Sequence, residues 1–180
     1  MNNDLGVNVN FDRTFPCNYL FEVLPAPILI FGGEARLNLT LAIKVASHSE
    51  SWTSVFADGL SLQGRIGAFT CPNADEVCVL SGSTAYIFNT TRSRDHAPVV
   101  FEMIVDALPL RWVNILVLVS FDSAIGVGST GVRWRTGRLC DDELKIVQKD
   151  GDSVTARGLK NGEDIELILD PSTGSVLPFE

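Results

Sequence analysis

Alternating apolar and polar residues are the feature that most limits what this chain can form. Apolar side chains occupy every second position in residues 35–45, "ARLNLTLAIKV". A strand places successive side chains on opposite faces of a sheet, whereas a helix would spread these leucines around its whole circumference. The stretch therefore predicts a long β-strand with one buried face.

Shorter versions of this alternation recur along the chain, separated by turn-forming residues such as "FGGE", "KDGDS" and "DPSTG". The clearest of them are "GVNVNF", "YLFEVL", "SLQGRIGAF", "AYIFNTT", "GVRWRT", "LKIVQK", "SVTARG" and "DIELIL". About ten to twelve strands with a turn roughly every ten residues are typical of all-β folds. We expect residues 1–180 to form a single all-β, antiparallel domain. Its architecture would be a two-sheet sandwich or a propeller-like β-meander with repeated hairpins.

Two segments depart from simple alternation. Residues 112–121, "WVNILVLVSF", are apolar at nearly every position, which predicts a central strand covered on both faces. Residues 97–109, "APVVFEMIVDALP", fit a short helix by the spacing of Phe101, Ile104 and Leu108. They also fit a strand, and their β-branched residues favour that interpretation.

Gly126, Gly128 and Gly131 in "SAIGVGSTGVRWRTGRL" have the spacing of a dinucleotide-binding loop. That loop needs a helix after the glycines, so that the helix N-terminus meets the pyrophosphate. Here the alternating "VRWRT" follows Gly131 and indicates a strand. We therefore interpret the glycines as tight-turn or bulge residues and predict no nucleotide or other cofactor.

Three hairpin-like stretches share a strand, a Ser-Thr-Gly/Ala turn and a second strand: residues 79–90, 125–136 and 168–179. Their small turn residues are Ala85, Gly131 and Gly174, which are 46 and 43 residues apart. A period in the forties is typical of a four-stranded propeller blade. The stretches resemble the repeat hairpins of PQQ-type β-propellers, and the resemblance implies repeated hairpins without any ligand residues.

Charge and composition exclude several classes of function. The chain has 14 basic and 22 acidic residues, a formal net charge of −8, which disfavours nucleic-acid binding. It has neither an apolar run long enough for a membrane helix nor a secretory signal at residues 1–13, so we expect a cytoplasmic protein that binds no membrane. The four cysteines lack metal-ligand spacing and are interpreted as free thiols: Cys17, Cys71, Cys78 and Cys140.

The residues suited to catalysis are few. His48 and His96 are the two histidines, and Asp95 beside His96 could orient its imidazole for acid–base chemistry. Three carboxylates lie in apolar sequence surroundings and are further candidates: Glu22, Glu102 and Asp106. A hydrolase that uses such scattered carboxylates or His96 is the alternative function. We favour solvated side chains, no catalytic residue and no metal site.

Trp134 lies between Arg133 and Arg135 in the predicted strand "GVRWRT". Alternation with Val132 predicts that Trp134 is a core residue and that the two arginines face solvent. With Asp141 and Asp142, these arginines form the predicted interaction patch. We expect a non-catalytic binding or protein-interaction module whose acidic charge steers a partner with a basic surface. A homodimer through an exposed edge or through the apolar region at residues 112–121 is a further option.

Overall fold

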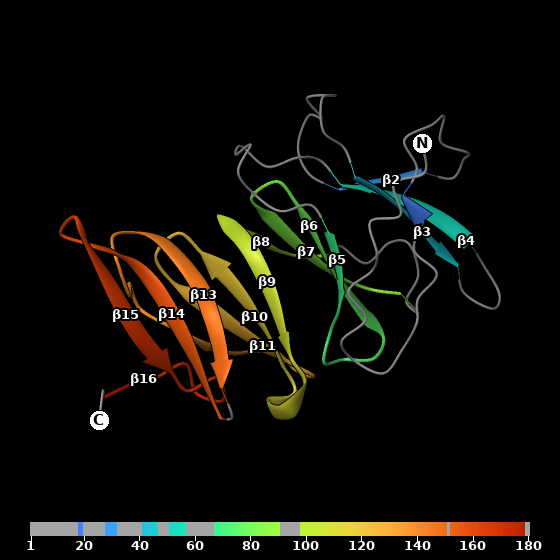
Figure 1. Cartoon of the computed structure of the whole chain (residues 1–180). Helices are drawn as coiled ribbons and strands as arrows, with labels where there is room; N and C mark the ends of the chain where they lie inside the picture. The colour runs from blue at the N-terminus through green and yellow to red at the C-terminus, as the bar shows by residue number, and fades with distance from the viewer. Residues whose placement is uncertain are drawn as a thin grey trace.

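The computed structural model describes residues 18–19, 28–31, 41–46, 51–56, 67–90, 98–150 and 152–178, and Figure 1 shows their arrangement. These residues form sixteen β-strands and a single turn of 3₁₀-helix. The strands make four sheets, none of which closes into a barrel. The predicted all-β, antiparallel meander is confirmed.

The first sheet contains the four strands nearest the N-terminus, in the order β1-β3-β4-β2. Their bounds are β1 (Asn18–Tyr19), β2 (Ile28–Phe31), β3 (Leu41–Ala46) and β4 (Ser51–Phe56). Strands β2 and β4 are parallel and the other pairs are antiparallel. The predicted strand over residues 35–45 corresponds to β3 from Leu41 onward, while residues 35–40 and "GVNVNF" lie outside the described residues.

The other three sheets are four-stranded antiparallel meanders in which strand order follows chain order. We call them the inner, central and terminal sheets. The inner sheet contains β5 (Gly67–Thr70), β6 (Glu76–Ser81), β7 (Thr84–Asn89) and β8 (Val99–Glu102). The central sheet contains β9 (Ile104–Leu110), β10 (Ile115–Ser120), β11 (Ala124–Gly128) and β12 (Gly131–Arg135). The terminal sheet contains β13 (Asp142–Asp150), β14 (Ser153–Lys160), β15 (Glu163–Leu169) and β16 (Val176–Leu177).

These three sheets begin at Gly67, Ile104 and Asp142, at intervals of 37 and 38 residues. The intervals differ from the 46 and 43 residues that separate the matching turns in the sequence. All three predicted hairpins exist, but residues 79–90 form the second and third strands of their sheet. Residues 125–136 and 168–179 form the third and fourth strands of theirs. The repeating unit is therefore a whole four-stranded sheet, and the turn motif does not mark its period.

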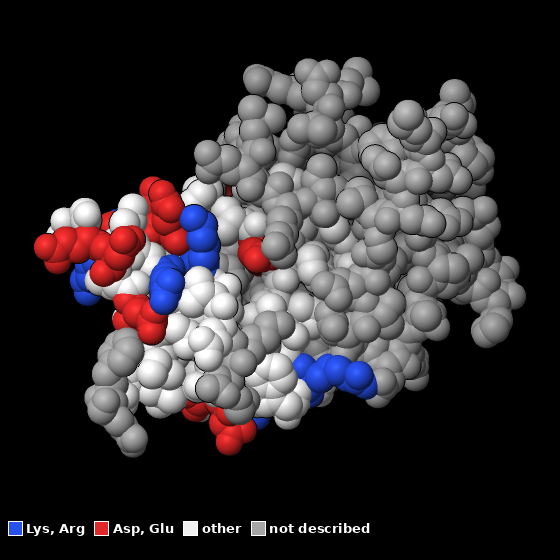
Figure 2. All heavy atoms as spheres, viewed as in Figure 1, with Lys and Arg blue, Asp and Glu red and all other residues white. Residues whose placement is uncertain are grey.

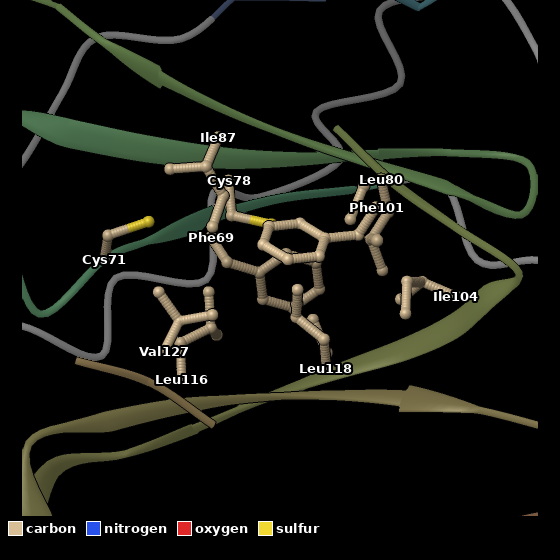
Figure 3. Packing of buried hydrophobic residues seen from close by; sticks show 12 residues of the cluster. Phe69, Cys71, Cys78, Leu80, Ile87, Phe101, Ile104, Leu116, Leu118 and Val127 are labelled. Carbon is tan, nitrogen blue, oxygen red and sulfur yellow. The ribbon is translucent and has the colours of Figure 1, made fainter. Parts of the chain in front are cut away.

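The inner and central sheets share a first hydrophobic core. Figure 3 shows Phe69, Leu80 and Phe101 of the inner sheet pointing toward Leu116 and Leu118 of the central sheet. The cluster also holds Cys71, Cys78, Ala85, Ile87, Ile104, Ala107 and Val127. Burial of these side chains at about 25 cal/mol per Å² of apolar surface is the main force that holds the two layers together.

A second core lies between the central and terminal sheets. Its buried members are Leu110, Ile115, Val117, Val119, Ala124, Trp134, Cys140, Leu144, Val154, Ala156 and Leu169. In β10, Leu116 and Leu118 face the first core while Ile115, Val117 and Val119 face the second. The central sheet is therefore the middle of three layers, one more layer than a two-sheet sandwich.

All six residues of β10 are buried, which confirms a central strand covered on both faces. The start of the predicted run is different. Residues Arg111–Val113 form a 3₁₀ turn that ends at Asn114 in the left-handed region, with φ of 54°. Trp112 is 46% exposed there, because the chain must reverse between β9 and β10 before the ladder can begin.

In the ambiguous segment, the described residues from Val99 onward are strand, as the β-branched residues indicated, and the chain changes sheet at a corner. Strand β8 ends at Glu102 and β9 begins at Ile104. Only Met103 lies between them, with φ of 62°, and the Ile104 amide donates to the carbonyl oxygen of Ser83 at 2.9 Å. One residue thus passes the chain directly from the inner sheet to the central sheet.

The three glycines of the dinucleotide-like loop belong to a strand–turn–strand unit, and each has a different role. Gly126 and Gly128 lie in β11, and Gly131 begins β12. Gly131 has φ of 110° and follows the tight turn between β11 and β12. At Gly126, a Cβ atom would lie 2.1 Å from Cε2 of Trp134, so a glycine is needed to accommodate the indole. At Gly128 a Cβ would make only ordinary contacts, the nearest at 3.7 Å.

No helix of the described residues is long and apolar enough to cross a bilayer.

Candidate functional site

The predicted interaction patch consists of two arginines on β12 and two aspartates at the start of β13. Arg133, Arg135, Asp141 and Asp142 are all exposed. The described contacts include none between the arginines and the aspartates. The four-residue patch remains a prediction, and its two halves are best considered separately.

Arg133 and Arg135 project from opposite faces of the central sheet. The register between β11 and β12 shifts between Gly126 and Val127, which inserts an extra residue at Arg133. Gly126 and Gly128 are two residues apart in β11, so they share one face of the sheet. Gly126 lies against Trp134 and Gly128 lies against Arg133 on that face. Arg133 therefore lies on the Trp134 face, toward the terminal sheet.

Arg135 lies on the other face, where its Cζ atom is 5.6 Å from the centroid of the Phe101 ring. This is a cation–π distance, and it places the guanidinium over the margin of the first core. Val132, paired with Val127 of the first core, shares this face and is 44% exposed. The simple alternation of arginines outside and Val132 with Trp134 inside is thus corrected by the bulge.

Trp134 is a core residue, as predicted, with 9% of its surface exposed. Its Nε1 donates a hydrogen bond of 2.9 Å to the carbonyl oxygen of Pro171. Gly174, with φ of 73°, lies against the indole, since a Cβ there would come within 2.6 Å of Cε3. Trp134 therefore joins the central sheet to the turn between β15 and β16.

Asp141 and Asp142 lie where the chain enters the terminal sheet. The side chain of Arg138 connects this entry to the β10–β11 turn, 3.7 Å from Asp122 and 3.4 Å from Asp141. Asp141 also accepts a hydrogen bond of 2.7 Å from the amide of Asn161, in the β14–β15 turn. The sequence alone did not reveal this role of Arg138, because Asp122 is 16 positions away and becomes its neighbour only in the folded chain.

The outer face of the terminal sheet lies opposite the second core, and its described side chains are exposed or half-buried, unlike the far face of the inner sheet, where Val77 and Val79 are buried. Cross-strand pairing places its side chains in rows. One row holds Asp142, Leu159 and Asp164, and the next holds Lys145, Arg157 and Glu166. A third row holds Gln148, Thr155, Ile168 and Leu177. The face is thus acidic at one end, mixed in the middle and partly apolar at the other end.

Charge separates the central and terminal sheets. Residues 141–178 contain nine acidic and four basic residues, whereas residues 104–140 contain two acidic and four basic residues. Figure 2 shows acidic side chains gathered at the left of the view, where the β14–β15 turn lies. Within the terminal sheet, Lys145 pairs with Glu143 at 3.0 Å and Arg157 with Glu166 at 2.8 Å. The acidic excess therefore lies at the end that carries Asp142 and Asp164.

The candidate catalytic side chains within the described part of the chain do not come together in one site. Glu102 is exposed on β8, as a solvated edge-strand carboxylate would be, and Asp106 accepts a hydrogen bond of 2.8 Å from the neighbouring Ala107 amide. The other candidates lie outside the described residues: Glu22, His48, Asp95 and His96. Within the described ranges, no three His, Cys, Asp or Glu side chains group closely enough to hold a metal ion.

Three cysteines are buried free thiols, as predicted, while Cys17 lies outside the described residues. Burial raises the pKa of Cys78 to about 12 and raises the pKa of Cys71 well above its usual range. Burial also raises the pKa of Cys140. Because the thiolate is the reactive form, these side chains act as small apolar residues.

The chain was compared with protein-family models, with curated proteins and with solved structures, and no match was found in any of the three.

Proposed function

We propose that this protein is a non-catalytic protein-interaction module that binds a partner with a basic surface. The observation that carries the proposal is the acidic row on the outer face of the terminal sheet. Asp142 and Asp164 flank Leu159 there, and the adjoining β14–β15 turn adds Glu163. An exposed acidic surface attracts a basic partner over long range and orients its approach.

The layered architecture supports this assignment of the surface. In stacked-repeat proteins the last repeat carries a polar outer face, because no further repeat covers it. The ion pairs in the middle row neutralise its charges, since Arg157 and Glu166 are 2.8 Å apart. No described salt bridge joins Asp142 or Asp164 to a basic residue, and Lys160, in register with Glu163, offsets one charge of the adjoining turn. The remaining acidic charge is available to a partner.

Capture from native lysate at low salt, followed by mass spectrometry, tests whether such a partner exists. We expect a protein with a basic surface that is retained at low salt. It should be lost at about 1 M salt, where the Debye length falls to about 3 Å. Recovery of no specific partner at low salt would contradict the proposal.

A pair of matched charge reversals then tests the surface. Asp164→Lys alters the acidic row, whereas Asp152→Lys makes the same change in net charge at the β13–β14 turn, at the other end of the sheet. We expect Asp164→Lys to slow association with the captured partner on the order of tenfold. Asp152→Lys should have a much smaller effect, and equal effects would show that only net charge matters.

A further inference from the structure

A second surface, independent of the acidic face, is the open edge of the central sheet. Strand β12 is the last strand of this sheet, and β11 is its one neighbour among the described strands. Val132, Arg133 and Arg135 are exposed along it, Val132 to 44%. An edge strand has unpaired backbone groups that can bind an additional strand from another protein, and the bulge and the two arginines of β12 restrict which strands it can accept.

The hydrogen bonds between β11 and β12 show which backbone groups face outward. The Thr136 amide donates to the carbonyl oxygen of Ala124 at 2.9 Å. Hydrogen-bonded and non-hydrogen-bonded pairs alternate along an antiparallel ladder, so the next residue, Arg135, directs its N–H and C=O away from β11. At the other end, Gly128 pairs with Gly131 across a two-residue turn, which makes Val132 the next outward-facing residue. Arg135 and Val132 therefore provide the backbone groups that an added strand would bind.

The charge of this edge is positive on both faces of the sheet. The bulge places Arg133 on the terminal-sheet side and leaves Arg135 on the inner-sheet side. Other exposed cations, such as Arg138, Lys145 and Arg157, pair with carboxylates. No carboxylate of the described residues forms a salt bridge with Arg133 or Arg135. Side chains that alternate along an added strand would meet one of these arginines on each face.

We propose that β12 accepts an extended acidic segment of a partner protein as a fifth strand of the central sheet. Backbone hydrogen bonds to Val132 and Arg135 would hold the segment, and its carboxylates would pair with Arg133 and Arg135. A small apolar side chain on the inner-sheet side would cover Val132. A second copy of the chain paired through the same edge would bring the arginines of two β12 strands together, which like-charge repulsion disfavours.

The probe is a fluorescent synthetic peptide of about eight residues in which pairs of valines alternate with pairs of glutamates, so that carboxylates lie on both faces of the added strand. Its length matches a typical strand. A peptide of valine and lysine is its control. Fluorescence anisotropy with the full chain should show at least about tenfold tighter binding of the glutamate peptide. The double variant Arg133→Glu/Arg135→Glu should reverse that preference.

Backbone dependence is tested at Val132. Val132→Pro removes an outward-facing donor without removing a ladder bond to β11, so it should abolish binding of the glutamate peptide. Val132→Thr keeps the donor and the strand preference and should bind normally. Circular dichroism and tryptophan fluorescence verify that each variant is folded.

Three results would overturn the proposal. The first is failure of the glutamate peptide to bind the unaltered chain, and the second is unchanged binding by a folded Val132→Pro variant. The third is a concentration-dependent dimer in sedimentation that Val132→Pro dissociates, since a second copy would then occupy the edge. None of these results bears on the acidic outer face, which the Asp164→Lys variant tests separately.

Discussion

The central and terminal sheets have the same four-strand meander but expose different parts of themselves. Every residue of β10 in the central sheet is buried, whereas β15 in the terminal sheet has three exposed and three half-buried residues before Leu169, which is buried. The central sheet lies between two cores and the terminal sheet lies against one. Alternation in a strand therefore records how many of its faces are covered, and continuous apolar sequence marks a strand covered on both faces, as in β10 and in β6 of the inner sheet.

This difference separates the two surfaces that we propose for partners. Both faces of the central sheet are packed, so its candidate surface is the edge strand β12. The candidate surface of the terminal sheet is a whole face, and that face has an acidic row. The two proposals thus concern a cationic edge and an anionic face of one molecule.

The largest difference between the two sheets should appear on truncation of a strand residue. Leu118→Ala removes a fully buried side chain from β10 and leaves a cavity in the first core, which should lower the free energy of unfolding by about 2–5 kcal/mol. Ile168→Ala, on the outer face of β15, should cost about 1 kcal/mol or less. Urea unfolding measures both values. Equal losses would mean that the outer face of the terminal sheet is covered as well.

A methyl group added against the Trp134 ring should cause the next largest loss in the free energy of unfolding. Gly126→Ala would place a Cβ 2.1 Å from Cε2 of Trp134, and overpacking of this kind should lower the free energy of unfolding by about 1–3 kcal/mol. Gly128→Ala, two residues along the same strand, should change it by less than about 0.5 kcal/mol. Thermal unfolding of the two variants compares them. A stable Gly126→Ala variant would argue against the close packing of the indole on β11.

Loss of the hydrogen bond from Trp134 to Pro171 should weaken the contact between the central and terminal sheets. Trp134→Phe leaves the buried carbonyl oxygen of Pro171 without its 2.9 Å donor, at a cost of about 1–2 kcal/mol. Hydrogen exchange should then become faster in β16, next to the turn that Trp134 holds. Trp112→Phe alters an exposed tryptophan and should change neither quantity. Unchanged exchange in Trp134→Phe would show that this turn is held by other contacts.

The smallest expected effect is a dependence of the free energy of unfolding on pH that arises from Asp170, in the turn between β15 and β16. The Thr173 hydroxyl donates to Asp170 at 2.8 Å and the Ser172 amide donates at 2.8 Å, and these bonds lower the pKa of the Asp170 carboxyl. A lowered pKa in the folded state stabilises the protein above the unfolded-state value of about 4. This contribution is lost as the pH falls below about 4 and through the lowered pKa.

Replacement of the hydroxyl donor tests this assignment. Thr173→Val should move the pKa of Asp170 back toward its usual value and reduce the loss of stability at acidic pH. NMR titration of the Asp170 carboxyl and unfolding across the acid range measure the two effects. An unchanged titration curve would show that Thr173 is not the main cause of the shift.

The sequence predicted most strand identities in the described part of the chain, because alternation is a local property. It also predicted the burial of Trp134 and the strand that follows Gly131. It did not predict the bulge at Arg133, since "GVRWRT" alternates without interruption and the register shift exists only against β11. For the same reason it placed both arginines on one face.

The candidate surfaces were only partly predictable. The sequence identified Asp141 and Asp142 as interaction residues, but Asp164, 22 positions after Asp142, became their neighbour only through the pairing of β13, β14 and β15. The matching turns were real hairpins, yet their spacing did not give the period of the sheets. A turn motif records local backbone geometry, whereas a sheet period depends on which strands pair.

By itself, the sequence determined that the described chain is extended strand and which residues turn it, because side-chain alternation and glycine conformation depend on neighbouring residues. Only the tertiary structure decided which sheet lies in the middle, which glycine accommodates the Trp134 ring, and which charges gather on one surface. Those outcomes depend on contacts between segments that are distant in sequence. Register is set when the strands pair, and burial is set when the sheets stack.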